Sequence, residues 1–119
     1  MNSYKELDVW KKSFALVLVI YKVTKKFPAS ELYGLTSQMR RAVVSIPSTI
    51  TEDFSRKSTK EYINFVQIAF ASGAELETQL LLAKELGMLS ITDYKAADRL
   101  LSEVMKMLNG LISSLRNKL

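Results

Sequence analysis

Apolar residues that recur at alternating steps of three and four dominate the second half of the sequence. One series consists of Tyr62, Val66, Ala69, Gly73, Leu76, Leu80 and Ala83. Another consists of Tyr94, Ala97, Leu101, Val104, Leu108, Leu111 and Leu115. This spacing places each series on one face of an α-helix and is typical of the seam of a left-handed helical bundle. Because strand-like alternation is missing, the sequence predicts an all-α protein.

Start and stop signals divide the chain into four helices. The first three are predicted over about residues 7–26, 35–54 and 58–87, and the fourth follows a cap at Ser90 or Thr92 and ends near residue 116. Pro47 lies inside the second helix, where we expect a kink or a short break because proline removes a backbone donor. Ser58 and Glu61 form a capping-box pattern. With 119 residues, 48% of them hydrophobic, the sequence predicts one domain over residues 1–119, an antiparallel up-down-up-down four-helix bundle.

The first and third predicted helices carry features beyond a simple core stripe. One apolar stripe of the first helix is Leu7, Trp10, Phe14, Val17 and Tyr21, and a second is Leu16, Ile20, Val23 and Phe27. A surface helix normally buries one stripe, so we expect something outside the four-helix core to cover the second face. In the third helix, small residues surround Gly73, which predicts the close approach of a neighbouring helix.

The composition excludes many kinds of chemistry. The chain has no cysteine and no histidine, which removes thiolate nucleophiles, imidazole acid–base catalysis and the usual zinc ligand sets. Glu52 and Asp53 are paired carboxylates, but adjacent residues diverge on a helix, and we interpret them as a solvated helix end. The sequence therefore predicts a non-enzymatic protein without a metal or cofactor.

Two further patterns concern the cellular location of the protein and its association with membranes. Glu6 and Asp8 stand where a signal peptide would need a basic and then an apolar stretch, which predicts a cytoplasmic protein. The most apolar run covers residues 14–21, whereas about 20 residues are needed to cross a bilayer. No membrane association is predicted.

The formal charge of +5 is concentrated in the first half, where residues 1–57 hold ten Lys and Arg against five Asp and Glu. Such a surface favours either solubility alone or contact with phosphates. The candidate nucleic-acid contacts are Arg40, Arg41, Arg56, Lys57 and Lys60. A secondary basic set on the first helix is Lys11, Lys12, Lys22, Lys25 and Lys26.

Arg40 and Arg41 permit a structural interpretation as well. Adjacent positions on a helix point about 100° apart, so at most one of them faces the bundle squarely. In the structural alternative, Arg41 forms a buried or half-buried ion pair with Glu75, because an interior charge needs a partner. The aromatic residues Tyr62, Phe65 and Phe70 could stack on bases, although their helical spacing favours core or interface positions.

Three sequence segments carry a resemblance to a known family. They are L-x-x-QMRRA-x-VSIP (35–47), F-x-x-IA-x-ASGAELETQL-x-x-A-x-x-LG (65–87) and Y-x-x-L-x-VW (4–10). Together they resemble the four-helix-bundle proteins encoded inside 23S rRNA intervening sequences, over nearly the whole chain. The chain departs from the family at Ile50-Thr51-Glu52-Asp53, where members usually have I-A-E-G.

The resemblance implies an assembly and a partner. Proteins of this family form homopentameric, barrel-like rings, which would use the surplus apolar face of the first helix. The family is similar to the accessory variability determinant of diversity-generating retroelements, a basic pentamer that partners a reverse transcriptase. RNA or DNA is therefore an expected partner, with a reverse transcriptase as a possible protein partner by analogy. The alternative is a protein-interaction module without a nucleic-acid role. No catalytic residues follow from the resemblance.

Overall fold

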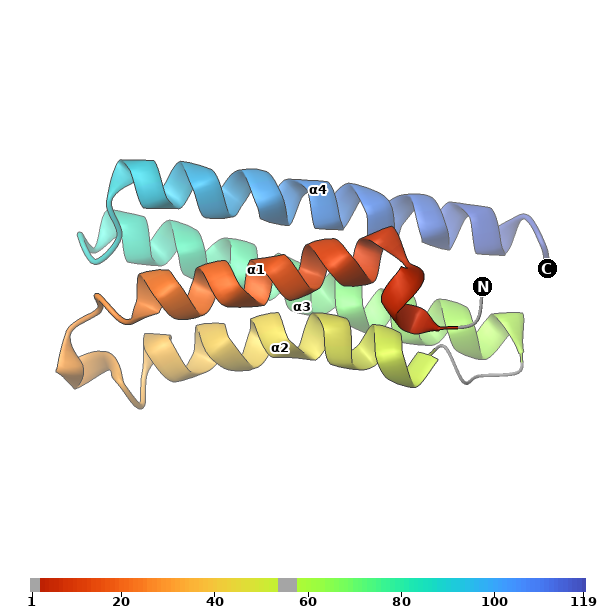
Figure 1. Ribbon diagram of the computed structural model, residues 1–119, viewed down its shortest axis with the longest axis horizontal. Helices are drawn as coiled ribbons and strands as arrows, with labels where there is room; N and C mark the ends of the chain where they lie inside the picture. The colour runs from red at the N-terminus through yellow and green to blue at the C-terminus, as the bar shows by residue number, and fades with distance from the viewer. Residues whose placement is uncertain (1–2, 54–57) are drawn as a thin grey trace.

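The computed structural model describes residues 3–53 and 58–119, and within them the chain forms four long helices. They are α1 (Asp8–Thr24), α2 (Leu35–Asp53), α3 (Thr59–Glu85) and α4 (Ile91–Arg116). Two short 3₁₀ helices, η1 (Tyr4–Glu6) and η2 (Ala29–Glu31), precede α1 and α2. Consecutive helices run in opposite directions, and α1 packs against both α2 and α4 (Figure 1). The predicted up-down-up-down four-helix bundle is confirmed.

The core runs along the inside of all four helices. Its most deeply buried large side chains are Leu16, Ile20, Met39, Ile46, Leu76, Leu80, Leu101 and Leu108. The apolar series predicted for α3 and α4 provides much of this core, although Ile112 is more deeply buried than Leu111. In the described part of the chain, no helix is long and apolar enough to cross a bilayer.

Side chains and a glycine define the helix ends. Ser58 Oγ accepts a hydrogen bond of 3.1 Å from the backbone N–H of Glu61, as the capping pattern predicted. Ser90 Oγ accepts a bond of the same length from Asp93, so Ser90 rather than Thr92 caps α4. Gly87 follows α3 with a φ of 77°, a conformation that glycine adopts without strain.

Helix α2 continues through Pro47 without a break. Proline provides no backbone N–H, so the carbonyl one turn earlier loses its usual donor. Hydroxyls supplement the backbone on both sides: Thr49 Oγ1 donates to the Ser45 carbonyl at 2.6 Å, and Thr51 Oγ1 donates to the Pro47 carbonyl at 2.9 Å. Back-bonding of this kind often bends a helix, and a kink at this position stays a prediction.

Helix α1 buries the stripe formed by Leu16, Ile20 and Val23, and Phe27, just after the helix, is buried as well. The other stripe is partly open, since Phe14 exposes 48% of its surface and Tyr21 exposes 39%. Leu18 beside them is also exposed. The surplus apolar face is therefore the stripe that contains Phe14, and the described residues cover it only in part: Trp10 and Val17 pack against the core, whereas Phe14 stays exposed.

Helices α3 and α4 approach closely at Gly73, as the small residues predicted. The glycine is buried, and a Cβ added there would overlap Met105 Sδ and lie 3.7 Å from Leu101 Cδ1. The side chain of Met105 therefore occupies the space that any larger residue at position 73 would need.

Candidate nucleic-acid interface

Arg40 is half-buried and held by α1. Its Nε donates a hydrogen bond of 2.9 Å to Thr24 Oγ1, and its guanidinium carbon lies 4.6 Å from the centroid of the Tyr21 ring. Thr24 is oriented in turn, because its Oγ1 donates to the Ile20 carbonyl at 2.7 Å. The end of α1 thus fixes the direction of this guanidinium through a hydrogen bond and a cation–π contact.

Arg41 is exposed, and its Nη2 donates to Ser37 Oγ at 3.3 Å. Glu75 is exposed too, and its Oε1 accepts from Gln79 Nε2 at 3.1 Å. Arg41 and Glu75 line one polar groove between α2 and α3, but the structure contains no ion pair between them. This differs from the expected buried pair. The physical reason is that Arg40, not Arg41, turns toward the bundle, which leaves Arg41 in solvent without need of an interior partner.

A second hollow, here called the arginine groove, lies between the end of α1, the α1–α2 connection and the first half of α2. It has a volume of about 490 Å³ and is lined by Tyr21, Leu32, Tyr33, Thr36, Ser37, Arg40, Arg41 and Val44. Sequence reasoning found only the two arginines in this set. The segment ASELYGL (29–35), two residues before QMRR (38–41), carries the available signal. It holds an apolar residue and an aromatic residue, Leu32 and Tyr33, in a connection where polar residues are usual.

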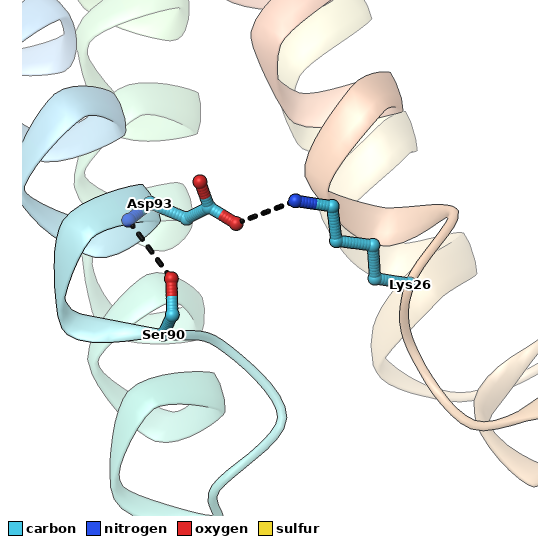
Figure 2. A network of polar contacts seen from close by, with 3 residues as sticks. All are labelled: Lys26, Ser90 and Asp93. Atoms are coloured by element: carbon cyan, nitrogen blue, oxygen red, sulfur yellow. Dashed lines mark hydrogen bonds and ion pairs between the residues drawn. The ribbon is translucent and has the colours of Figure 1, made fainter.

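The lysines of α1 and of the two positions that follow it divide into two groups. Lys26 Nζ lies 3.0 Å from Asp93 Oδ2, and the backbone N–H of Asp93 donates to Ser90 Oγ (Figure 2). Lys12 Nζ lies 2.9 Å from Glu103 Oε2. Hydrogen bonding and charge from Lys12 lower the pKa of the Glu103 carboxyl. Both lysines therefore join α1 to α4, whereas Lys11, Lys22 and Lys25 are exposed and form no ion pair with a described residue.

The predicted basic residues do not form a single patch. Lys22 and Lys25 lie at the end of α1 that holds Arg40, whereas Lys60 is exposed in the first turn of α3, at the opposite end of the bundle. Lys11 lies near that opposite end as well. Arg56 and Lys57 lie outside the described residues.

The other sequence candidates have ordinary structural positions. Glu52 is exposed near the end of α2, and the described residues contain no group of three or more acids that could hold a metal ion. Tyr62 and Phe70 pack against the core, as their spacing favoured, and Phe65 is half-buried.

Known proteins confirm the fold and show the family. A crystal structure with the same fold is that of a protein of unknown function from the S23 ribosomal protein family of Bacteroides thetaiotaomicron. It is 24% identical, covers 88% of this chain and 95% of its own, and superposes with a TM-score of 0.82. No functionally curated protein matches the sequence. The sequence pattern of one family matches residues 5–110, and the chain therefore belongs to the 23S rRNA-intervening sequence protein family.

Proposed function

We propose that this protein is a non-enzymatic homo-oligomer, a pentamer by the family resemblance, that binds RNA or DNA in the cytoplasm. The observation that carries the proposal is the arginine groove. Two guanidinium groups line it, and neither pairs with a carboxylate of the described residues. Exposed Lys22 and Lys25 add positive charge at the same end of the bundle. Cations without acidic partners are the groups that phosphates attract.

Assembly would strengthen such a surface. A ring of five copies multiplies the charge of +5 to about +25, and phosphate affinity rises with the number of contacts made together. The exposed side chains of Phe14 and Leu18 on α1 support self-association, because exposed apolar residues on a helix favour a protein interface. We propose that another copy of the chain covers them.

A second candidate is an assembly module that docks a protein, such as a reverse transcriptase by family analogy, and has no nucleic-acid role. The observation that favours it is a separate exposed apolar set, Leu82, Leu86 and Ile91, at the α3–α4 connection. These side chains are exposed and apolar, and such a set suits a protein partner better than a phosphate.

Fluorescence anisotropy separates the two candidates. The purified protein is titrated with a structured RNA, a duplex DNA and a single strand at about 50 and 200 mM salt, while light scattering gives its mass. We expect an oligomer whose affinity falls steeply between those concentrations, because several phosphates are contacted at once. Absence of binding to all three ligands at the lower concentration would overturn the nucleic-acid proposal.

A pair of matched variants tests the site. Arg41→Gln removes an exposed charge at the arginine groove, and Arg116→Gln removes an exposed charge at the end of α4, at the other end of the bundle. We expect Arg41→Gln to weaken binding and flatten its salt dependence, and Arg116→Gln to do neither. Equal effects of the two variants would show that total charge, and not this surface, determines affinity.

A further inference from the structure

The arginine groove has an apolar wall that a surface for phosphates alone does not need. Leu32 and Tyr33 come from the α1–α2 connection, Val44 from α2 and Tyr21 from α1. Tyr33 exposes 93% of its surface, so the core gains nothing from its ring. An aromatic face beside arginines is the arrangement on which unpaired bases stack.

Arg40 and Arg41 both line this groove, and no acid lines it, although Arg41 also borders the polar groove that contains Glu75. Arg40 is fixed by Thr24 and Tyr21, and Arg41 by Ser37. Because the two positive charges line one hollow, they repel each other there. An anion placed between them removes that repulsion and gains charge-assisted hydrogen bonds from both.

The floor of the groove adds hydroxyl donors at the start of a helix. Thr36 and Ser37 lie in the first turn of α2, where backbone amides lack intrahelical acceptors and the helix dipole favours a negative charge. Thr36 is only 4% exposed, and its buried Oγ1 has no hydrogen-bond partner among the described residues. Threonine in a helix has two accessible rotamers, and a turn about χ1 would give this hydroxyl an anion oxygen to bind. Ser37 Oγ accepts from Arg41 and keeps its own proton free to donate.

One carboxylate lies near this turn and is already occupied. Glu31 Oε1 accepts a hydrogen bond of 3.1 Å from the backbone N–H of Leu35, and Glu31 does not line the groove. The acid therefore satisfies the first amide of α2 and is absent from the groove lining, but its negative charge opposes an anion at Thr36 and Ser37, which the charges of Arg40 and Arg41 must outweigh.

We infer that the arginine groove binds a nucleoside phosphate. The phosphate lies between Arg40 and Arg41 with the hydroxyls of Thr36 and Ser37, and the base lies against Tyr33 and the apolar wall. The volume of about 490 Å³ is within the usual range of small-molecule sites and exceeds what an inorganic phosphate fills. The same chemistry is available from a free mononucleotide or from an unpaired nucleotide of a strand. The second source rests on the proposed function, and the first does not.

A fluorescent methylanthraniloyl nucleoside monophosphate is the direct probe, titrated against the full-length protein at about 50 mM salt with anisotropy as the readout. Unlabelled AMP, adenosine and inorganic phosphate then compete for the site. We expect AMP to displace the probe at a concentration about tenfold or more below that of adenosine or phosphate, because each of these lacks one half of the ligand. Equal competition by inorganic phosphate and AMP would overturn the inference, since the apolar wall would then hold nothing.

Tyr33→Ala is the decisive variant, because so exposed a ring can be removed without disturbing the core. We expect it to weaken probe binding about tenfold. The control is Arg116→Gln, which we expect to leave probe binding unchanged. Tyr4→Ala on η1 is a less suitable control, because Tyr4 is half-buried. Probe binding that is insensitive to Tyr33→Ala contradicts the inference.

A single-strand titration with the same variants identifies the source of the nucleotide. Weakening of both probe and strand by Tyr33→Ala supports a groove that holds one nucleotide of a strand. Weakening of the probe alone supports a groove for a free nucleotide, and this result would stand even if no strand were bound. Strand binding without any probe binding, unaffected by Tyr33→Ala, overturns the groove inference and leaves the proposed function intact.

Discussion

Replacing Gly73 with alanine tests the close contact between α3 and α4. At a solvent-facing helix position this change stabilises a protein by about 1 kcal/mol, because glycine is the more flexible residue when unfolded. At position 73 the added Cβ would overlap Met105 Sδ, and Leu101 Cδ1 lies only 3.7 Å away. Overpacking of a core costs about 1–3 kcal/mol, so we expect a net loss of about 1 kcal/mol in the free energy of unfolding.

Gly110 provides a matched control, since it is exposed in α4 and a Cβ added there would have open space around it. Gly110→Ala should raise the free energy of unfolding by about 1 kcal/mol. A second background, Met105→Ala, removes the side chain that blocks position 73, and there Gly73→Ala should become stabilising. Urea unfolding followed by circular dichroism at one protein concentration measures all four variants. Equal stabilisation by Gly73→Ala and Gly110→Ala in the otherwise unchanged protein would refute the close contact.

Three further predictions concern the helix ends, the proline and an ion pair. Ser90→Ala should lower the free energy of unfolding by about 1 kcal/mol and Thr92→Ala by less than about 0.5 kcal/mol, because only Ser90 caps α4; the opposite order in urea unfolding would identify Thr92 as the cap. Pro47→Ala restores a backbone donor, which stabilises the helix by about 3 kcal/mol, but it removes about two buried methylenes at about 0.8 kcal/mol each. We therefore expect the free energy of unfolding to rise by about 1 kcal/mol in the same assay. A decrease would show that α2 needs the proline ring. Lys12→Met should raise the pKa of Glu103 in an NMR titration, and an unchanged pKa would contradict the pairing. Because the folded pKa of Glu103 is lowered, the pair stabilises the protein above the ordinary carboxyl range, and this contribution is lost as pH falls through the lowered pKa. The free energies of unfolding of wild type and variant should therefore converge in acid.

The helices and their seams could be predicted because the signals are local. In α3 and α4, one apolar series on each helix predicted most of the core positions, although Ile63 and Ile112 are buried more deeply than the predicted Tyr62 and Leu111. Helix α1 is different, since both of its stripes are apolar and periodicity alone does not rank them. The contacts of Leu16 and Ile20 with the rest of the bundle decide the matter, and these exist only in the folded chain.

The candidate site was less predictable because it depends on neighbours distant in sequence. Arg40 and Arg41 have the same chemistry, and nothing local says that Thr24, on another helix, binds the first of them. The arginine groove depends on the path of the α1–α2 connection, which brings Leu32 and Tyr33 beside α2. Propensities describe where such a connection begins and ends, but they do not describe where its side chains go.

The contact between α1 and α4 has a consequence for how the protein folds and unfolds. The other helix interfaces join consecutive helices, whereas this one joins the first helix to the last, with its Lys26–Asp93 pair 67 residues apart in sequence. Closing so long a loop has a larger entropic cost than forming a hairpin of consecutive helices, so we expect this seam to form late on the folding path. Interactions that form after the transition state alter the unfolding rate and hardly alter the folding rate. We therefore expect substitutions in the seam that completes the bundle to change how long the protein stays folded, rather than how fast it folds.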